Sequence, residues 1–383
     1  LNINIPKGKI TTILGPNGSG KSTLLSILST YNKPSKGDVF IGDKNLKTLK
    51  TKEIAKKYTE FVYDFKWIDD FGAAKQFAVS KASNDNILIL DCDEYLQSDK
   101  TVLEKLNSML ENEPQRAGRI KCINVLEDDS KNTDWITRAF NRKYYKVEGK
   151  IHEQIVKTDG EPADTFLSAV VIKHVGYALN DDEKKKKALR NIKLLKKRLA
   201  ELEKNFDSDI TQNNEKEIPY IYYQLGKSYY MEKDYNNACD FFSKGLSFDL
   251  EPKLEYVIDM VETYGYAMLN CGKVQEALSY TSIYDVFGNS ADFKFLMGLI
   301  YMKNAMFDEA VNEFQKAAEY KESRVEGTNS YLAYYNIGVI YECLGNIGKA
   351  QEYYKKCNGY SKAVERLKNG RHGNLTKCRK TGV

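Results

Sequence analysis

Small residues recur at a fixed offset within an apolar pattern in the C-terminal half of the chain. A glycine is followed twelve residues later by an alanine at positions 226 and 238, 265 and 277, 298 and 310, and 338 and 350. Aromatic and aliphatic residues occupy helical spacings around each glycine, as Tyr222, Leu225 and Tyr229 do around Gly226. The pattern predicts stacked helical hairpins over residues 216–370.

A single long helix is predicted just before these hairpins. Its apolar positions recur every three or four residues and are Leu189, Ile192, Leu195, Leu199 and Leu202. Residues 181–204 carry ten Lys or Arg against five Asp or Glu, so the outer face is basic. Two interpretations stay open for the segment 181–215: a solvated linker helix between two domains, or a surface that attracts acidic lipid headgroups or another anionic acceptor.

Two apolar, β-rich runs predict strands in the N-terminal half, at residues 10–14 and 86–90. A helical pattern at residues 22–28 follows the first run, and carboxylates follow the second. The expected fold class is therefore an α/β part, with a sheet and helices, followed by an all-α solenoid of repeats.

A glycine-rich loop joins the first strand to its helix. Its residues are Gly15, Pro16, Asn17, Gly18, Ser19, Gly20, Lys21, Ser22 and Thr23. The glycines allow backbone N–H groups to surround phosphates, Lys21 can reach the β- and γ-phosphate oxygens, and Ser22 can offer a hydroxyl to Mg²⁺. Strand, loop and helix in this order predict a nucleotide-triphosphate site, with ATP as the possible ligand.

Residues 1–57 resemble the start of an ABC-transporter ATPase subunit, and the flanks 1–8 and 34–43 carry the resemblance together with the loop. That family also needs an LSGGQ-type signature, and the sequence contains none. The run 87–91 could stand as a Walker B strand, but it lies only 70 residues after Lys21. The resemblance therefore implies nucleotide binding, while ATPase-driven transport is not expected.

Asp91 and Asp93 follow the second strand directly. Two carboxylates at the end of a strand offer hard oxygen ligands for Mg²⁺ or Mn²⁺, and the alternative is a surface turn capped by acids. With the block 65–76, this arrangement resembles the second half of the catalytic domain in family-two glycosyltransferases of GT-A fold, over residues 58–180. The resemblance implies that Asp91 and Asp93 hold a divalent ion against the diphosphate of a nucleotide-sugar donor.

The blocks 138–142, 149–154 and 174–177 look like later elements of the same family. They imply that Glu153 is the general base, that Asp93 takes part in catalysis, and that His152 contacts the metal or a phosphate. A satisfied core histidine is the other interpretation of His152. Lys75 stands where the family usually has Arg, and the strands that hold the nucleotide in that family are absent.

The repeats resemble tetratricopeptide repeats, which expose a concave groove that commonly binds peptide. The resemblance implies binding of a sugar acceptor (polysaccharide, protein or peptide), or self-association. The basic tail 371–383 is expected to fray.

Composition narrows the class of protein. The 383 residues are 42% hydrophobic and 29% charged with a net charge of +5, as in a globular protein. No eighteen-residue apolar run and no secretory signal occur, and the first residue is not Met, which hints at truncation. Seven scattered cysteines predict reduced thiols in a cytoplasmic protein. No nucleic-acid partner is expected.

The sequence thus predicts a metal-assisted glycosyltransferase with a repeat domain for its acceptor or partner. Two alternatives remain: an ATP-binding fragment of an ABC transporter, and a non-catalytic repeat scaffold.

Overall fold

The computed structural model describes residues 40–41, 44–45, 55–56, 59–125, 130–174, 181–205 and 212–371. The chain divides into two compact units, residues 1–66 and residues 67–383. In the first unit the described strands are β1 (Phe40–Ile41) and β2 (Lys44–Asn45), which pair antiparallel. The predicted strand 10–14, the glycine-rich loop and the helix 22–28 lie outside the described residues.

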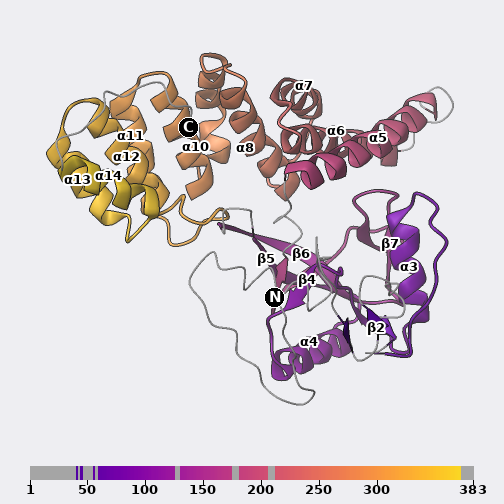
Figure 1. The fold of residues 1–383 in the computed structure, drawn as a ribbon. Coiled ribbons are helices and arrows are strands. Elements are labelled where there is room, and N and C mark those ends of the chain that lie inside the picture. Colours follow the sequence, from indigo (N-terminus) through magenta and orange to yellow (C-terminus); the bar gives the residue numbers. More distant parts are fainter. Residues whose placement is uncertain are drawn as a thin grey trace. The chain divides into compact units, whose positions relative to one another are not determined.

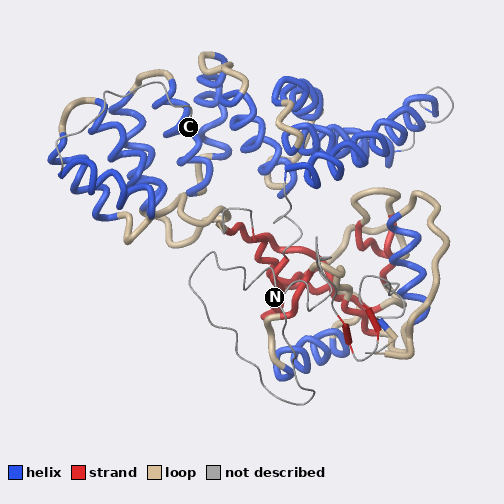
Figure 2. The backbone as a smooth tube through the Cα atoms, viewed as in Figure 1, coloured by secondary structure: helices blue, strands red, loops and turns tan. Residues whose placement is uncertain are grey.

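The second unit begins with a mixed five-stranded sheet in the order β3-β6-β5-β9-β4. The pair β5–β9 is parallel and the other neighbouring pairs are antiparallel. Figure 2 draws these strands in red. The strands are β3 (Asn86–Leu88), β4 (Glu94–Leu96), β5 (Ala117–Val125), β6 (Lys131–Asn141) and β9 (Thr165–His174).

Helices α3 (Phe71–Lys81) and α4 (Lys100–Asn112) cover opposite faces of this sheet. Asp70 and Asp99 cap their N-termini by accepting hydrogen bonds from the backbone N–H of residues 73 and 102. Leu106 of α4 packs in one buried cluster with Ala139, whereas Val79 of α3 packs in another with Phe140. Because consecutive residues of a strand point to opposite faces, Ala139 and Phe140 place the two helices on the two sides.

A small hairpin, β7 (Tyr145–Glu148) with β8 (Gln154–Lys157), lies beside α3. Gly72 makes this approach possible, since a Cβ there would lie 2.6 Å from the carbonyl oxygen of Gly149. The backbone N–H of residue 72 donates to that same oxygen at 3.0 Å. The N-terminal α/β architecture is thus present, while its predicted GT-A type is not confirmed.

The rest of the second unit is helical (Figure 1). The predicted basic helix is α5, which buries Ile192, Leu195 and Leu202 against α6, while Leu189 is exposed. It therefore packs as part of the helical stack. The helices are α5 (Asp181–Asn205), α6 (Gln212–Met231), α7 (Tyr235–Leu246), α8 (Glu255–Asn270), η1 (Glu276–Ile283), α9 (Tyr284–Phe287), α10 (Ala291–Lys303), α11 (Phe307–Ala318), α12 (Tyr331–Cys343), α13 (Ile347–Lys356) and α14 (Ser361–Arg371).

The fixed glycine spacing has a steric explanation. A Cβ on Gly226, Gly298 or Gly338 would lie 2.5–2.7 Å from the ring of an aromatic residue sixteen positions later, in the second helix of the hairpin. Each ring occupies the space that the missing side chain leaves. The twelve-residue partners of the glycines are also buried, at 0% exposure for Ala238 and Ala310. The predicted all-α solenoid of repeats is confirmed.

The second hairpin departs from the predicted pattern. After α8 its second helix is replaced by the 3₁₀ helix η1 and the short α9. Within η1, the hydroxyls of Thr281 and Ser282 donate to carbonyls three residues earlier, at 2.9 and 2.7 Å. Such local bonds compete with the α-helical ladder and accompany the tighter winding.

Among the described helices, none combines the length and the apolar character needed to cross a membrane.

Candidate functional site

The nucleotide site predicted at Gly15, Asn17, Gly18, Gly20, Lys21, Ser22 and Thr23 lies outside the described residues. It therefore stays a prediction from the sequence. The other predicted site residues can be located in the structure: Asp91 and Asp93 lie between β3 and β4, and His152 and Glu153 lie between β7 and β8.

Asp91 lies between two cations. Its carboxylate is 2.7 Å from Lys75 Nζ and 2.9 Å from Arg138 Nη2. Arg138 also reaches Glu94 at 2.7 Å, and Glu94 accepts a hydrogen bond from the backbone N–H of Asp91 at 2.8 Å. Burial, the largest influence, opposes ionisation of Asp91, but the hydrogen bond from Lys75 and the charges of Arg138 and Lys75 outweigh it and lower the pKa of Asp91.

Asp93 has a different partner. Its carboxylate lies 3.3 Å from Nε2 of His174, whose Nδ1 is 2.9 Å from Oδ1 of Asn124. The sheet brings these residues together, because residue 174 is in register with Glu94 on one side and with Asn124 on the other. The hydrogen bond with His174 is the main cause that lowers the pKa of Asp93, while burial opposes it.

Glu153 joins the same cluster through Lys75. Its carboxylate is 2.6 Å from Lys75 Nζ, so one ammonium bridges Glu153 and Asp91. Lys75, which departs from the family pattern, is thus the residue that links the two predicted acids. The structure brings Asp91 and Glu153 together and pairs Asp93 separately with His174.

His152 has a left-handed backbone, with φ of 55°. Its Nε2 is buried without a hydrogen-bond partner. Burial is the main cause that lowers the pKa of His152 to about 4, so the imidazole is neutral at pH 7. The ring is neutral, as in a core histidine, but its buried Nε2 is not satisfied as that interpretation expected.

The proposed metal ligands do not form a ready cation site. Within the part of the chain that the structure describes, no three or more His, Cys, Asp or Glu side chains are grouped so that they could hold a metal ion. A divalent ion at Asp91 would have to displace Lys75 and Arg138, both of which already neutralise the carboxylate. The set Asp91, Asp93 and His152 is therefore not assembled as the sequence predicted.

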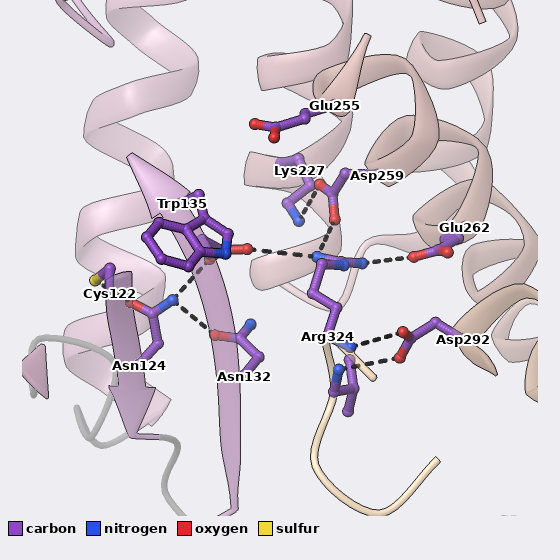
Figure 3. A network of polar contacts seen from close by, with 12 residues as sticks. Cys122, Asn124, Asn132, Trp135, Lys227, Glu255, Asp259, Glu262, Asp292 and Arg324 are labelled. Atoms are coloured by element: carbon purple, nitrogen blue, oxygen red, sulfur yellow. Dashed lines mark hydrogen bonds and ion pairs between the residues drawn. The ribbon is translucent and has the colours of Figure 1, made fainter. Parts of the chain in front are cut away.

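A second polar network joins the sheet to the repeats, and sequence reasoning missed it. Figure 3 shows Arg324, in the loop between α11 and α12, directed toward Asp259 and Glu262. Its Nη1 is 2.7 Å from Asp259 and its Nη2 is 2.7 Å from Glu262. Asp292 accepts hydrogen bonds from the backbone N–H of Arg324 and Val325 at 2.8 and 3.0 Å.

The same loop extends the sheet. Val325 forms an isolated antiparallel bridge with Asn132, and the N–H of Thr133 donates to the carbonyl of Arg324 at 2.9 Å. A second link comes from Arg119, whose guanidinium is 2.6 Å from the carbonyl of Trp135 and also pairs with Glu255 of α8. Arg119 and Glu255 are 136 residues apart, and Asn132 and Val325 are further apart still, so no local pattern could have revealed these contacts.

Comparisons with known proteins indicate the family of the chain. A family profile described as ABC transporter matches residues 1–205, which is more than half of the 383 residues. The chain belongs to the ABC transporter family. Tetratricopeptide-repeat profiles match residues 219–252, 291–324 and 331–363, so this ABC-family chain also carries such repeats.

Curated relatives of the ABC-family chain are ATP-binding proteins. It is 52% identical over 56 residues to the iron(3+)-hydroxamate import ATP-binding protein FhuC of Bacillus subtilis, which is 15% of this chain and 21% of the relative. It is 49% identical over 55 residues to the petrobactin import ATP-binding protein YclP of the same organism, 14% of this chain and 22% of that one. The chain thus spans about a fifth of the length of these relatives.

A solved structure of YrrB, described as a TPR protein with an unusual peptide-binding site, is 22% identical and covers 49% of this chain and 95% of its own, with a TM-score of 0.36.

These findings correct the predicted function. The profile that covers residues 58–180 is that of the ABC transporter family, and the relatives are ATP-binding proteins. The prediction of a glycosyltransferase is therefore wrong, and the roles given to Glu153, Asp93 and a nucleotide-sugar donor are withdrawn with it. The alternative of an ABC-type ATP-binding part with tetratricopeptide repeats fits better.

Proposed function

We propose that this chain binds ATP with Mg²⁺ through its glycine-rich loop and docks a peptide or protein partner through its repeats. The observation that carries the proposal is the complete loop 15–23 inside the matched residues 1–205. The proposal concerns binding, because the sequence contains no LSGGQ-type signature.

The chemistry of the loop suits a triphosphate. Gly15, Gly18 and Gly20 permit the backbone N–H groups to turn toward the phosphates. Asn17 lies between the first two glycines, and Thr23 ends the loop. Lys21 would contribute a cation to the β- and γ-phosphates and Ser22 a hydroxyl to Mg²⁺. When bound, Mg²⁺ supplies charge neutralisation between phosphate oxygens.

The proposed organisation follows the sequence boundaries. Residues 1–57 are the ATP-binding part, 58–180 the sheet, 181–215 the basic helix with its connection, and 216–370 the repeats, before the tail 371–383. The hairpins support partner docking, since stacked repeats of this kind present an extended concave surface.

Titration of the full chain with a fluorescent ATP analogue and Mg²⁺ tests the ATP proposal. Loss of a charge-assisted phosphate contact is worth about 1.5–3 kcal/mol, so Lys21→Ala is expected to weaken binding roughly 10- to 100-fold. Lys36→Ala, which removes a lysine outside the loop, is the matched control and should bind like the wild type. Equal affinity of the wild type and Lys21→Ala would contradict the proposal.

Partner docking is tested by screening the full chain on a peptide array. Peptides retained by the wild type and lost from a variant with a broken hairpin, Gly298→Pro, support it, because proline inside α10 breaks the helix. Retention of the same peptides by both proteins would count against the repeats as the docking surface.

A further inference from the structure

Two cysteines from different hairpins meet inside the helical stack. Cys239 of α7 and Cys271, which caps the C-terminus of α8, have their Sγ atoms 3.7 Å apart. They are 32 positions apart in the sequence. We propose that this pair is an oxidation site, at which a two-electron oxidant of the hydrogen peroxide class closes a reversible disulfide between the first and second hairpins.

The geometry requires only a small movement. A disulfide has an S–S distance of about 2.05 Å, so the two sulfurs must approach by roughly 1.6 Å. Cys271 is the partner able to move, because it follows the end of its helix. The next residue, Gly272, has φ of +84°, and a side chain there would meet nothing within 4 Å. The turn therefore has room to adjust.

The two thiols differ in access. Cys239 is 1% exposed, whereas Cys271 is partly buried and its thiol lies 3.5 Å from the carbonyl of Met268. Burial, with the neighbouring Cys271, raises the pKa of Cys239 to about 12. Because Cys271 is the more exposed of the two, it is the sulfur that meets the oxidant first, and Cys239 is the one that follows.

Lys273 lies near both cysteines. Burial opposes the charge of Lys273, but its interactions with Cys239 and Cys271 outweigh this and raise the pKa of Lys273. The ammonium therefore acts on both sulfurs.

The chemistry balances with peroxide as the oxidant. The Cys271 thiolate attacks one peroxide oxygen, the O–O bond breaks, and the released hydroxide takes a proton to leave as water, which leaves a sulfenic acid on Cys271. The sulfur of Cys239 then loses its proton and attacks Cys271, the S–S bond forms, the S–O bond breaks, and a second water leaves. Two thiols lose two electrons, and one hydrogen peroxide becomes two waters.

The test uses the full chain, treated with hydrogen peroxide under native conditions and then alkylated in denaturant. Intact mass spectrometry should show two fewer alkylated cysteines, and peptide mapping should link Cys239 to Cys271, with reversal by dithiothreitol. Cys271→Ser should abolish the link. Cys343→Ser, which removes an exposed thiol elsewhere, is the matched control and should leave it unchanged.

Closure should also shift thermal unfolding. A cross-link over a loop of this length restricts the unfolded chain, so the midpoint of the wild type should rise by about 5 °C or more on oxidation. The proposal is overturned if both thiols remain alkylatable after peroxide, if Cys271 advances to sulfinic acid without a link, or if peroxide joins other cysteines instead.

Discussion

At the scale of single residues, the hairpin glycines make a sharp prediction. Adding one methyl group at Gly298 places a Cβ 2.7 Å from the buried ring of Phe314. Overpacking of this kind usually costs about 1–3 kcal/mol, so Gly298→Ala should lower the free energy of unfolding by about 2 kcal/mol. Urea unfolding followed by far-UV circular dichroism measures it.

Gly348 is the matched control. It lies in the first turn of α13, and the nearest atom to an added Cβ is 4.0 Å away. Alanine is the better helix former by up to about 1 kcal/mol, so Gly348→Ala should be neutral or stabilising. Equal destabilisation by the two substitutions would show that the loss at Gly298 does not come from its ring contact.

His152 predicts how stability depends on pH. Its pKa is about 4 in the folded chain, against an ordinary value of about 6.5 in an unfolded one. The folded state therefore favours the neutral ring, and its contribution is complete above pH 6.5 and is lost as the pH falls toward 4. Between pH 7 and pH 5 this residue should remove about 2 kcal/mol of the free energy of unfolding.

The matched variant is His152→Asn. Asparagine accepts the left-handed φ of 55° at this position but carries no titrating ring. Between pH 7 and pH 5 the free energy of unfolding should fall in both proteins. The fall should be about 2 kcal/mol smaller in the variant than in the wild type. Urea titrations at the two pH values measure this drop. If it is equal in the two proteins, the ring takes up its proton as readily in the folded chain as in the unfolded one.

At the scale of elements, the repeats could be predicted because their pattern is local. Each glycine, its alanine and its aromatic partner lie within seventeen residues. Packing within one hairpin therefore determines which residue types occupy these positions. The sequence still predicted four equal hairpins, and the second one differs. There an added Cβ on Gly265 would lie 2.7 Å from Leu296 of α10 and 3.2 Å from the ring of Tyr280, which follows fifteen positions later in the 3₁₀ helix η1.

The polar cluster of the sheet was only partly predictable. Asp91, Asp93 and Glu153 were picked out by residue type, but their partners were not. Arg138 meets Asp91 from 47 residues away, and His174 meets Asp93 through strand register. Strand pairing sets these contacts, and a single sequence carries no direct signal of it. Asp91, which looked like a metal ligand, is thus neutralised by two cations.

At the scale of the whole second unit, the Arg324 network decides whether sheet and repeats act as one body. Asp259 and Glu262 are 9% and 3% exposed, and both pair with this guanidinium, while Asp259 also pairs with Lys227 at 2.6 Å. Burial, the largest influence, opposes the charge of Arg324, yet the carboxylates of Asp259 and Glu262 raise its pKa further above the ordinary value. Burial likewise raises the pKa of Glu262 to about 7 despite Arg324.

Removing Arg324 should therefore uncouple the two parts. Arg324→Ala leaves the buried carboxylate of Glu262 without its cation, which typically costs about 3–5 kcal/mol, whereas Asp259 keeps Lys227 at 2.6 Å. Lys321→Ala, an exposed lysine in the same loop, is the control and should change little.

In a Trp67→Phe background, Trp135 is the remaining tryptophan and reports on the sheet, while circular dichroism is dominated by the helices. With Arg324 present the two signals should unfold together, and in Arg324→Ala the tryptophan transition should occur at lower urea. Coincident transitions in the variant would mean that the bridge at Val325 and the pair of Arg119 with Glu255 suffice to hold the sheet on the repeats.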